Sequence, residues 1–174
     1  RHDGRTTVGS MKELLNHEEQ RHRYCGHCFR CGSDVVGNEV FVFHGSADKN
    51  YASLARDGFL KTYWRTSSGS WQRFGSGFYF GFEASKSHEY PLAEMRKLSP
   101  GVHPRTMLLC KVARGRIHMT QSDIPDMTGH RLQALGFNSL HGYAGTRLNY
   151  DEFVVYEEEA ILPYALVTYQ FRKR

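Results

Sequence analysis

The chain has 174 residues, of which 40% are hydrophobic and 13% aromatic, enough apolar material for one domain with a sizeable core. A formal net charge of +5 and a pI near 9.1 favour anionic ligands, nucleic acid among them, without requiring one. No apolar run approaches the roughly 20 residues that a membrane-spanning helix needs, so we expect no membrane partner.

Four cysteines, three of them clustered, do not form the pattern of a secreted disulfide framework. We therefore expect a reducing intracellular compartment, either the nucleus or the cytoplasm. No signal peptide is visible. Because the chain starts at Arg1 and not at a methionine, we expect it to be a piece of a longer protein, which leaves targeting open.

The first part of the chain is polar and is predicted to be an extension, residues 1–38, in front of one domain, residues 39–174. The segment Ser10–Glu13 fits a capping box, in which a serine caps a helix and a glutamate three residues later reaches back to it. A short helix is therefore predicted to run as far as Arg23. This helix has only a narrow apolar face, so we expect it to pack against another element.

A cluster of thiols and imidazoles ends this extension. Four of these residues are candidate ligands of a structural zinc ion: His22, Cys25, Cys28 and Cys31. Structural zinc sites hold the ion tetrahedrally with four nitrogen or sulfur ligands, which are usually supplied as two close pairs. The Cys28-x-x-Cys31 spacing fits one pair, and Cys25-x-x-Cys28 competes with it. The alternatives are a set of reduced thiols, or half of a site that residues outside this sequence complete.

The domain is predicted to begin with a buried strand, because Val40–Phe43 is a short apolar run. That strand leads into His44–Ser46. Asp48 or Asn50 can cap a following helix, which should end near Asp57 with a glycine at the C′ position. Three residues of this helix keep the spacing of one face and are expected in the core: Tyr51, Leu54 and Ala55.

The most distinctive stretch is Phe74–Tyr90, which reads FGSGFYFGFEASKSHEY. Its glycines let the backbone approach a ligand closely or take positive φ, and its aromatic run, Phe78–Phe80, predicts a strand. Ser85–Ser87 suits a helix start that presents hydroxyls, in a helical pattern to Leu98 that Pro91 kinks or restarts. Aromatic ring faces, hydroxyls and a glycine backbone without side chains together suit a flat heteroaromatic ligand that carries an amide. The alternative is a strand-turn-helix corner in an ordinary core.

Further along the chain, apolar runs rich in aromatic and β-branched residues predict more strands. Their ranges are Met107–Val112 as a central strand, Ile117–Met119 beside it, Phe137–Gly142, Asp151–Tyr156 and Ala165–Phe171. A helix is predicted over Thr128–Leu135, closed by Gly136. Short strands interleaved with a few helices are compatible with an α+β domain.

Three segments, in this order along the chain, carry a resemblance to a known family: Val42–Ser46, Phe74–Tyr90 and Leu148–Tyr156. Together they resemble the poly(ADP-ribose) polymerase catalytic domains, which are diphtheria-toxin-like ADP-ribosyltransferases with a His-Tyr-Glu motif. The resemblance covers roughly Val40 to the C-terminus. It implies an α+β ADP-ribosyltransferase fold, in which two packed, mostly antiparallel sheets with flanking helices enclose a cleft for NAD.

The resemblance also implies roles for individual residues. The catalytic set would be His44, Tyr79 and Glu152. The NAD-binding set would be His44, Gly45, Ser46, Tyr79, Ser87 and Tyr90. In this arrangement the imidazole binds a ribose hydroxyl, the Gly45 backbone and the Ser87 hydroxyl bind the nicotinamide carboxamide, and the two tyrosines enclose the nicotinamide ring. The loop Lys61–Ser76 would lie over NAD, where the candidates for contact with adenine or the pyrophosphate are Trp64, Arg65, Trp71 and Arg73. The alternative is that these are solvated loop residues.

The implied activity is transfer of ADP-ribose from NAD to a protein or nucleic-acid acceptor, with release of nicotinamide and without a catalytic metal. The transition state resembles an oxocarbenium ion, which a carboxylate at Glu152 would stabilise. Strand alternation places Glu152 on the same face as Val154 and Tyr156. The alternatives are a catalytically silent module of this fold that binds nucleic acid or ADP-ribose, and an NAD glycohydrolase. The sequence leaves the acceptor, the product length and the oligomeric state open.

Overall fold

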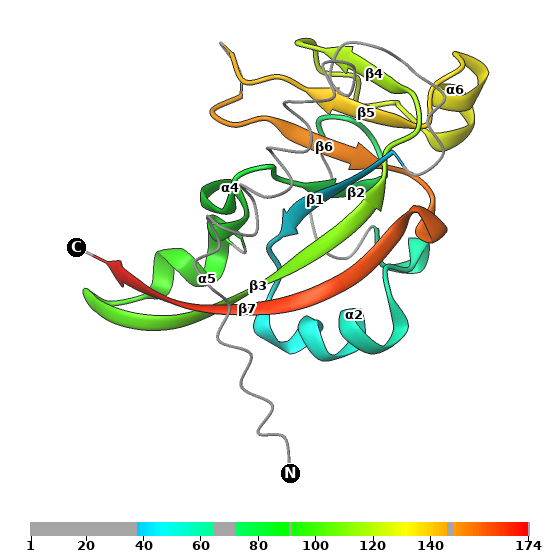
Figure 1. Ribbon diagram of the computed structural model, residues 1–174. Helices are drawn as coiled ribbons and strands as arrows, with labels where there is room; N and C mark the ends of the chain where they lie inside the picture. The colour runs from blue at the N-terminus through cyan, green and yellow to red at the C-terminus, as the bar shows by residue number, and fades with distance from the viewer. Residues whose placement is uncertain (1–37, 65–71, 91, 146–147, 174) are drawn as a thin grey trace, which may run out of the picture. The chain divides into compact units, whose positions relative to one another are not determined.

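Figure 1 shows the computed structural model, which describes residues 38–64, 72–90, 92–145 and 148–173. These residues belong to one compact unit, Val36–Arg174. The candidate zinc ligands and the helix predicted near Ser10 lie outside the described residues, so both stay predictions. None of the helices in the described part of the chain is long and apolar enough to cross a bilayer.

Within the described residues, seven strands form two sheets. Sheet A has the order β1-β3-β7 and is antiparallel throughout: β1 is Glu39–His44, β3 is Gly101–Ala113 and β7 is Ile161–Lys173. Sheet B has the order β2-β6-β5-β4: β2 is Phe78–Phe80, β6 is Glu152–Val155, β5 is Ser139–Gly142 and β4 is Ile117–Thr120. Only the β4–β5 pair is parallel. The predicted α+β class with two mostly antiparallel sheets is therefore confirmed.

Short helices connect the strands. The α-helices are α2 (Tyr51–Asp57), α4 (Ala84–His88), α5 (Leu92–Lys97) and α6 (Gly129–Ala134). Three 3-10 turns complete the set: η1 (Asp48–Asn50), η2 (Lys61–Tyr63) and η3 (Glu158–Ala160). In Figure 1, α6 lies at one end of sheet B, and α5 lies beside the far ends of β3 and β7. The Lys173 ammonium holds that far end together by donating to carbonyls at the end of α5.

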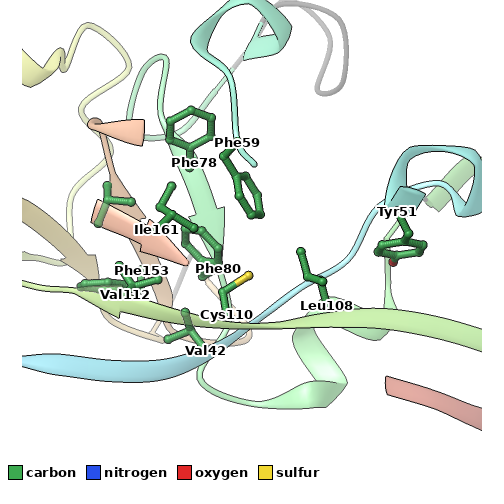
Figure 2. Packing of buried hydrophobic residues seen from close by; sticks show 11 residues of the cluster. Val42, Tyr51, Phe59, Phe78, Phe80, Leu108, Cys110, Val112, Phe153 and Ile161 are labelled. Carbon is green, nitrogen blue, oxygen red and sulfur yellow. The ribbon is translucent and has the colours of Figure 1, made fainter. Parts of the chain in front are cut away.

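Two hydrophobic clusters cover the two faces of sheet B. Figure 2 shows the first, which joins the sheets; Val42, Leu108, Cys110, Val112 and Ile161 come from sheet A, and Phe78, Phe80, Phe153 and Val155 come from sheet B. The second packs α6 and its flanking loops against the opposite face of sheet B; its members are Phe74, Met127, Leu132, Leu140, Leu148, Val154 and Tyr156. Sheet B is thus covered on both sides, which explains why every residue of β5 and β6 is buried.

One backbone bridge links the ends of β1 and β2. The Phe43 N–H donates to the Gly81 carbonyl at 2.8 Å, and the Gly81 N–H donates back to the Phe43 carbonyl at 2.9 Å. Because Phe43 precedes His44 and Gly81 lies two residues after Tyr79, this bridge brings two distant segments of the sequence to the same place.

Several predicted elements need correction. β4 does not extend sheet A beside β3; it pairs with β5 in sheet B. Both edges of β3 are already occupied by β1 and β7, and Gly115, with φ of 57°, turns the chain away from the sheet. The central strand itself is longer than predicted, running from Gly101 to Ala113.

The helices also differ in detail from the prediction. The helical pattern to Leu98 is two helices, with α4 ending at His88 and α5 beginning at Leu92, as expected where a proline removes a backbone donor. The residue that caps α4 is Glu83, without a side-chain hydrogen bond, so Ser87 lies in the last turn of the helix and not at its start. In α2, Ala55 is exposed, whereas Tyr51 is buried as predicted.

Candidate active site

His44 ends β1 with its ring between two aromatic side chains. The ring centroid lies 4.9 Å from that of Phe59 and 5.7 Å from that of Phe80. Its Nδ1 lies 3.0 Å from the Tyr79 carbonyl oxygen. A carbonyl only accepts, so Nδ1 carries the hydrogen and Nε2 of the neutral ring is an acceptor. Burial lowers the pKa of His44, against a smaller opposing effect of this hydrogen bond, so the ring is neutral near pH 7.

The loop after β1 approaches α4 so closely that only glycine fits. A Cβ on Gly45 would lie 2.0 Å from the Ser87 carbonyl oxygen and 3.1 Å from Cβ of Tyr90. No described residue hydrogen-bonds to the Gly45 backbone N–H or carbonyl. The next N–H, that of Ser46, is already used, because it donates to the Tyr51 hydroxyl at 2.9 Å. Gly45 therefore offers a free donor and acceptor beside α4.

Tyr79 is fixed by its hydroxyl. The oxygen accepts from the Phe74 N–H at 2.9 Å, and the O–H donates to the Gly75 carbonyl at 2.8 Å. Gly75 has φ of 67°, and a Cβ there would lie 1.9 Å from the Met127 carbonyl oxygen, so this turn requires glycine. Burial raises the pKa of Tyr79, and the nearby charge of Glu152 adds to the effect. The phenol is therefore a protonated, immobile platform and not a proton donor to a substrate.

Glu152 and Lys86 form a buried ion pair. Oε1 of the glutamate lies 2.8 Å from Nζ of the lysine, and the two side chains are 9% and 14% exposed. Burial alone would lower the pKa of Lys86, but its hydrogen bond and charge interaction with Glu152 raise the pKa above its ordinary value. Gly81 lets the lysine stem pass, since a Cβ there would lie 2.9 Å from the Lys86 Cβ. Lys86 is thus neither a solvated lysine nor free for a substrate phosphate.

The strand register sets Glu152 beside Tyr79. Tyr79 lies opposite Val154 in the β2–β6 pair, and Glu152 is two residues before Val154. Because side chains two residues apart share a face, Glu152 and Tyr79 lie on the same face of sheet B. The charge of Glu152 acts on the Tyr79 phenol, as expected for neighbours.

Ser87 and Tyr90 stand on the other side of the Gly45 loop. The Ser87 hydroxyl is buried and donates to the Phe43 carbonyl at 2.8 Å, which leaves its oxygen lone pairs to accept a further hydrogen bond. The Tyr90 ring is 39% exposed, and the Lys86 ammonium lies 5.2 Å from its centroid. Lys86 therefore touches both Glu152 and Tyr90 and connects the two parts of the candidate site.

Most of the residues singled out from the sequence are therefore neighbours. One group is Gly45, Ser87 and Tyr90; a second is Tyr79 and Glu152; Lys86 bridges the two groups, and His44 binds the Tyr79 carbonyl. Ser46 adjoins the first group but gives its N–H to Tyr51.

Two of the loop residues expected over NAD have other partners, and the remaining two, Arg65 and Trp71, lie outside the described residues. Trp64 packs on Phe78 with 5.1 Å between ring centroids, and Arg73 pairs with Asp123 at 2.6 Å. Within the described residues, no group of His, Cys, Asp and Glu side chains is arranged to hold a metal ion. Sequence reasoning missed the role of Lys86, although its position between Ser85 and Ser87 in the family-like motif was a signal.

A comparison with protein families identifies the family of the chain. The family model described as the poly(ADP-ribose) polymerase catalytic domain matches residues 8–133, well over half of the chain. The matched residues include His44, Gly45, Tyr79, Ser87 and Tyr90, and the match ends before β6, where Glu152 lies. The chain belongs to the poly(ADP-ribose) polymerase catalytic domain family of NAD-dependent ADP-ribosyltransferases.

Proposed function

We propose that this chain transfers ADP-ribose from NAD to a protein or nucleic-acid acceptor and releases nicotinamide. The observation that carries the proposal is the buried Glu152 carboxylate, held by Lys86 on the same face of sheet B as Tyr79. Burying a charge costs free energy even when it is paired, and charged groups buried in this way are often found at functional sites. In a member of this family, a carboxylate has such a role, because positive charge develops on the substrate ribose.

The donors and acceptors around Gly45 match a carboxamide. The Gly45 N–H can donate to the carboxamide oxygen, and the Gly45 carbonyl can accept from its amino group. Ser87 gives its hydrogen to Phe43, so its oxygen is left to accept the second amino hydrogen. In the proposed complex the nicotinamide ring lies between the fixed ring of Tyr79 and the more exposed ring of Tyr90.

His44 is suited to the adjacent ribose. With Nδ1–H donated to the Tyr79 carbonyl, Nε2 accepts a hydrogen bond from a ribose hydroxyl. Burial keeps the pKa of His44 low, so this acceptor persists at neutral pH. Its role in the proposal is to bind and orient the sugar.

The proposed reaction breaks the bond between ribose C1′ and the nicotinamide nitrogen. The electron pair of that bond stays with nicotinamide, which leaves as a neutral molecule, and positive charge develops on C1′ and the ring oxygen. The Glu152 carboxylate stabilises that charge, in the way that carboxylates act in glycoside hydrolysis. The acceptor then forms a bond to C1′ and loses its proton. Lys86 pairs with the carboxylate and fixes its position.

The decisive experiment compares wild type with Glu152→Gln in nicotinamide release from labelled NAD. The amide keeps the size of the side chain and removes the charge, so release should fall roughly 100-fold or more while NAD still binds. Glu159→Gln is the matched control, because Glu159 is an exposed glutamate in the nearby η3 turn. Wild type that releases no nicotinamide with any acceptor offered refutes the proposal.

Mass analysis of the products identifies the acceptor. Label on protein or nucleic acid supports transfer, whereas free ADP-ribose alone indicates an NAD glycohydrolase. Salt-dependent binding of nucleic acid without NAD turnover indicates a silent binding module. Structural zinc at His22, Cys25, Cys28 and Cys31, a domain spanning residues 39–174 and an intracellular location all stay predictions.

A further inference from the structure

A second polar cluster lies on sheet A behind the candidate nicotinamide site. Arg105 on β3 and Tyr169 on β7 are direct partners in the strand register, so their side chains share a face. Arg105 is only 5% exposed, and its Nη2 donates to the Tyr90 carbonyl at 3.0 Å. The charge of Arg105 also acts on the Tyr169 phenol. The buried Arg105 therefore hydrogen-bonds to the backbone of Tyr90, the residue proposed to cover nicotinamide.

Tyr169 also contacts α4. Its hydroxyl oxygen lies 2.7 Å from Nδ1 of His88, the last residue of the helix. In the neutral His88 ring, Nδ1 can accept the hydrogen of the Tyr169 hydroxyl. The His88 ring also packs on Phe171, with 4.3 Å between centroids. The end of α4 is thus bound to both β3 and β7.

The same part of β3 holds the loop that carries Gly45. The Tyr51 hydroxyl accepts the Ser46 N–H at 2.9 Å and donates to the Thr106 carbonyl at 2.8 Å. Thr106 follows Arg105 directly, and the charge of Arg105 acts on the Tyr51 phenol. Adjacent residues of one strand therefore fasten both sides of the nicotinamide site, the Gly45 loop and the Ser87–Tyr90 segment.

We propose that Arg105, Tyr169 and His88 are positioning residues that set the distance between the Gly45 loop and the Ser87–Tyr90 segment, and that protonation of His88 loosens this arrangement. The inference rests on the proposed function, because it takes that gap to be the nicotinamide site. None of the three residues is proposed to touch the reacting atoms. They act through the Tyr90 backbone and the end of α4.

The charges around His88 determine the direction of the pH effect. Arg105 faces it from β3, the Tyr169 hydroxyl faces it from β7, and Glu89 follows it in the chain. Burial first and the Arg105 charge second lower the pKa of His88 below its ordinary value of 6.5, against an opposing effect of Glu89. Acid that protonates His88 removes the acceptor for Tyr169 and puts a second cation beside Arg105. Nicotinamide affinity should therefore be highest above pH 6.5 and fall as acid reaches the lowered pKa.

The test measures nicotinamide binding to the full chain by ligand-observed NMR between pH 5 and pH 8, together with amide hydrogen exchange of residues 84–90. Tyr169→Phe keeps the ring and removes the hydroxyl, so at pH 7.5 affinity should fall about tenfold and exchange in residues 84–90 should accelerate. His88→Phe should weaken binding and remove the acid-side loss of affinity. Tyr164→Phe is the matched control, because that tyrosine is on the same strand and is exposed. Thermal unfolding of each variant checks that it is folded.

The outcomes separate this inference from the proposed function. Wild type that binds no nicotinamide overturns both. Wild type that binds, with Tyr169→Phe within twofold of it and unchanged exchange in residues 84–90, overturns only the positioning role. A His88→Phe variant that keeps the wild-type pH dependence overturns the part assigned to His88.

Discussion

The two sheets differ in how they are covered, and the candidate chemistry follows the difference. Sheet B has short strands that are buried on both faces, and it carries Tyr79 and Glu152. Sheet A has two 13-residue strands, and β7 exposes every second side chain, as in Leu166 at 50%. A strand that is packed on both faces holds a charged side chain rigidly. A long strand with one exposed face can instead contact other segments of the chain. The Glu152 carboxylate lies in the first kind of sheet and the Arg105 cluster in the second.

The largest expected effect on stability comes from the shared core. Phe153 is fully buried between the sheets, so Phe153→Ala should lower the free energy of unfolding by about 3–5 kcal/mol. Leu166→Ala on the open face of β7 should change it by less than about 0.5 kcal/mol. Chemical denaturation of both variants measures the contrast. Equal losses would show that the open face of β7 is covered as well as sheet B.

Lys86→Met tests whether the buried ion pair serves turnover. The change leaves the Glu152 carboxylate buried without its partner, so nicotinamide release should fall on the order of tenfold to a hundredfold. Lys97→Met, an exposed lysine in α5, is the control, and Lys86→Arg should restore part of the rate. A Lys86→Met rate equal to wild type would remove the lysine from the proposed site.

A smaller effect is expected from a single buried hydroxyl on the second core cluster. The Tyr156 O–H donates to the Phe74 carbonyl at 2.6 Å, and burial raises the pKa of Tyr156, so the group is a permanent donor. Tyr156→Phe should lower the free energy of unfolding by about 1 kcal/mol, because the Phe74 carbonyl loses its hydrogen-bond donor. Thermal unfolding detects such a loss, and Tyr164→Phe on the exposed face of β7 should show none. A larger loss in the exposed variant would reverse the contrast drawn between the sheets.

The smallest expected effect is a dependence of stability on pH. His44 and His88 both have folded-state pKa values below 6.5, with burial as the main cause, so both are neutral in the folded chain. Their contribution is complete above pH 6.5 and is lost as pH falls through the lowered folded-state values. Unfolding measured at pH 7.5 and pH 5 should show lower stability in acid, and less of a decrease in His88→Phe. Stability that rises on acidification would contradict both assignments.

The sequence predicted the strands well, where the signal is local. Apolar runs indicated each of the seven strands of the described residues, but β3 begins six residues and β7 four residues earlier than predicted. Gly136, which follows α6 with φ of 83°, was a reliable stop signal. Pairing was harder, because β4 lies next to β3 in the chain and yet belongs to the other sheet. Nothing in a short apolar run specifies its neighbour.

The candidate site was predicted in part. The motif-like segments drew attention to Gly45, Tyr79 and Ser87, and the range matched by the family model contains all three residues. Two features could not be predicted, the partner of Lys86 and the contacts of Arg105. Each joins residues that are not neighbours in the sequence. Lys86 and Glu152 are 66 positions apart, and the register of β2 with β6 brings these two residues together.

The bridge between Phe43 and Gly81 has a practical consequence. Its two amide hydrogens sit at the junction of the sheets, one residue from His44 and two from Tyr79. Their NMR signals are therefore natural reporters of ligand occupancy on either side of the junction. A spectroscopist could follow titrations through these two resonances without attaching any label near the substrate.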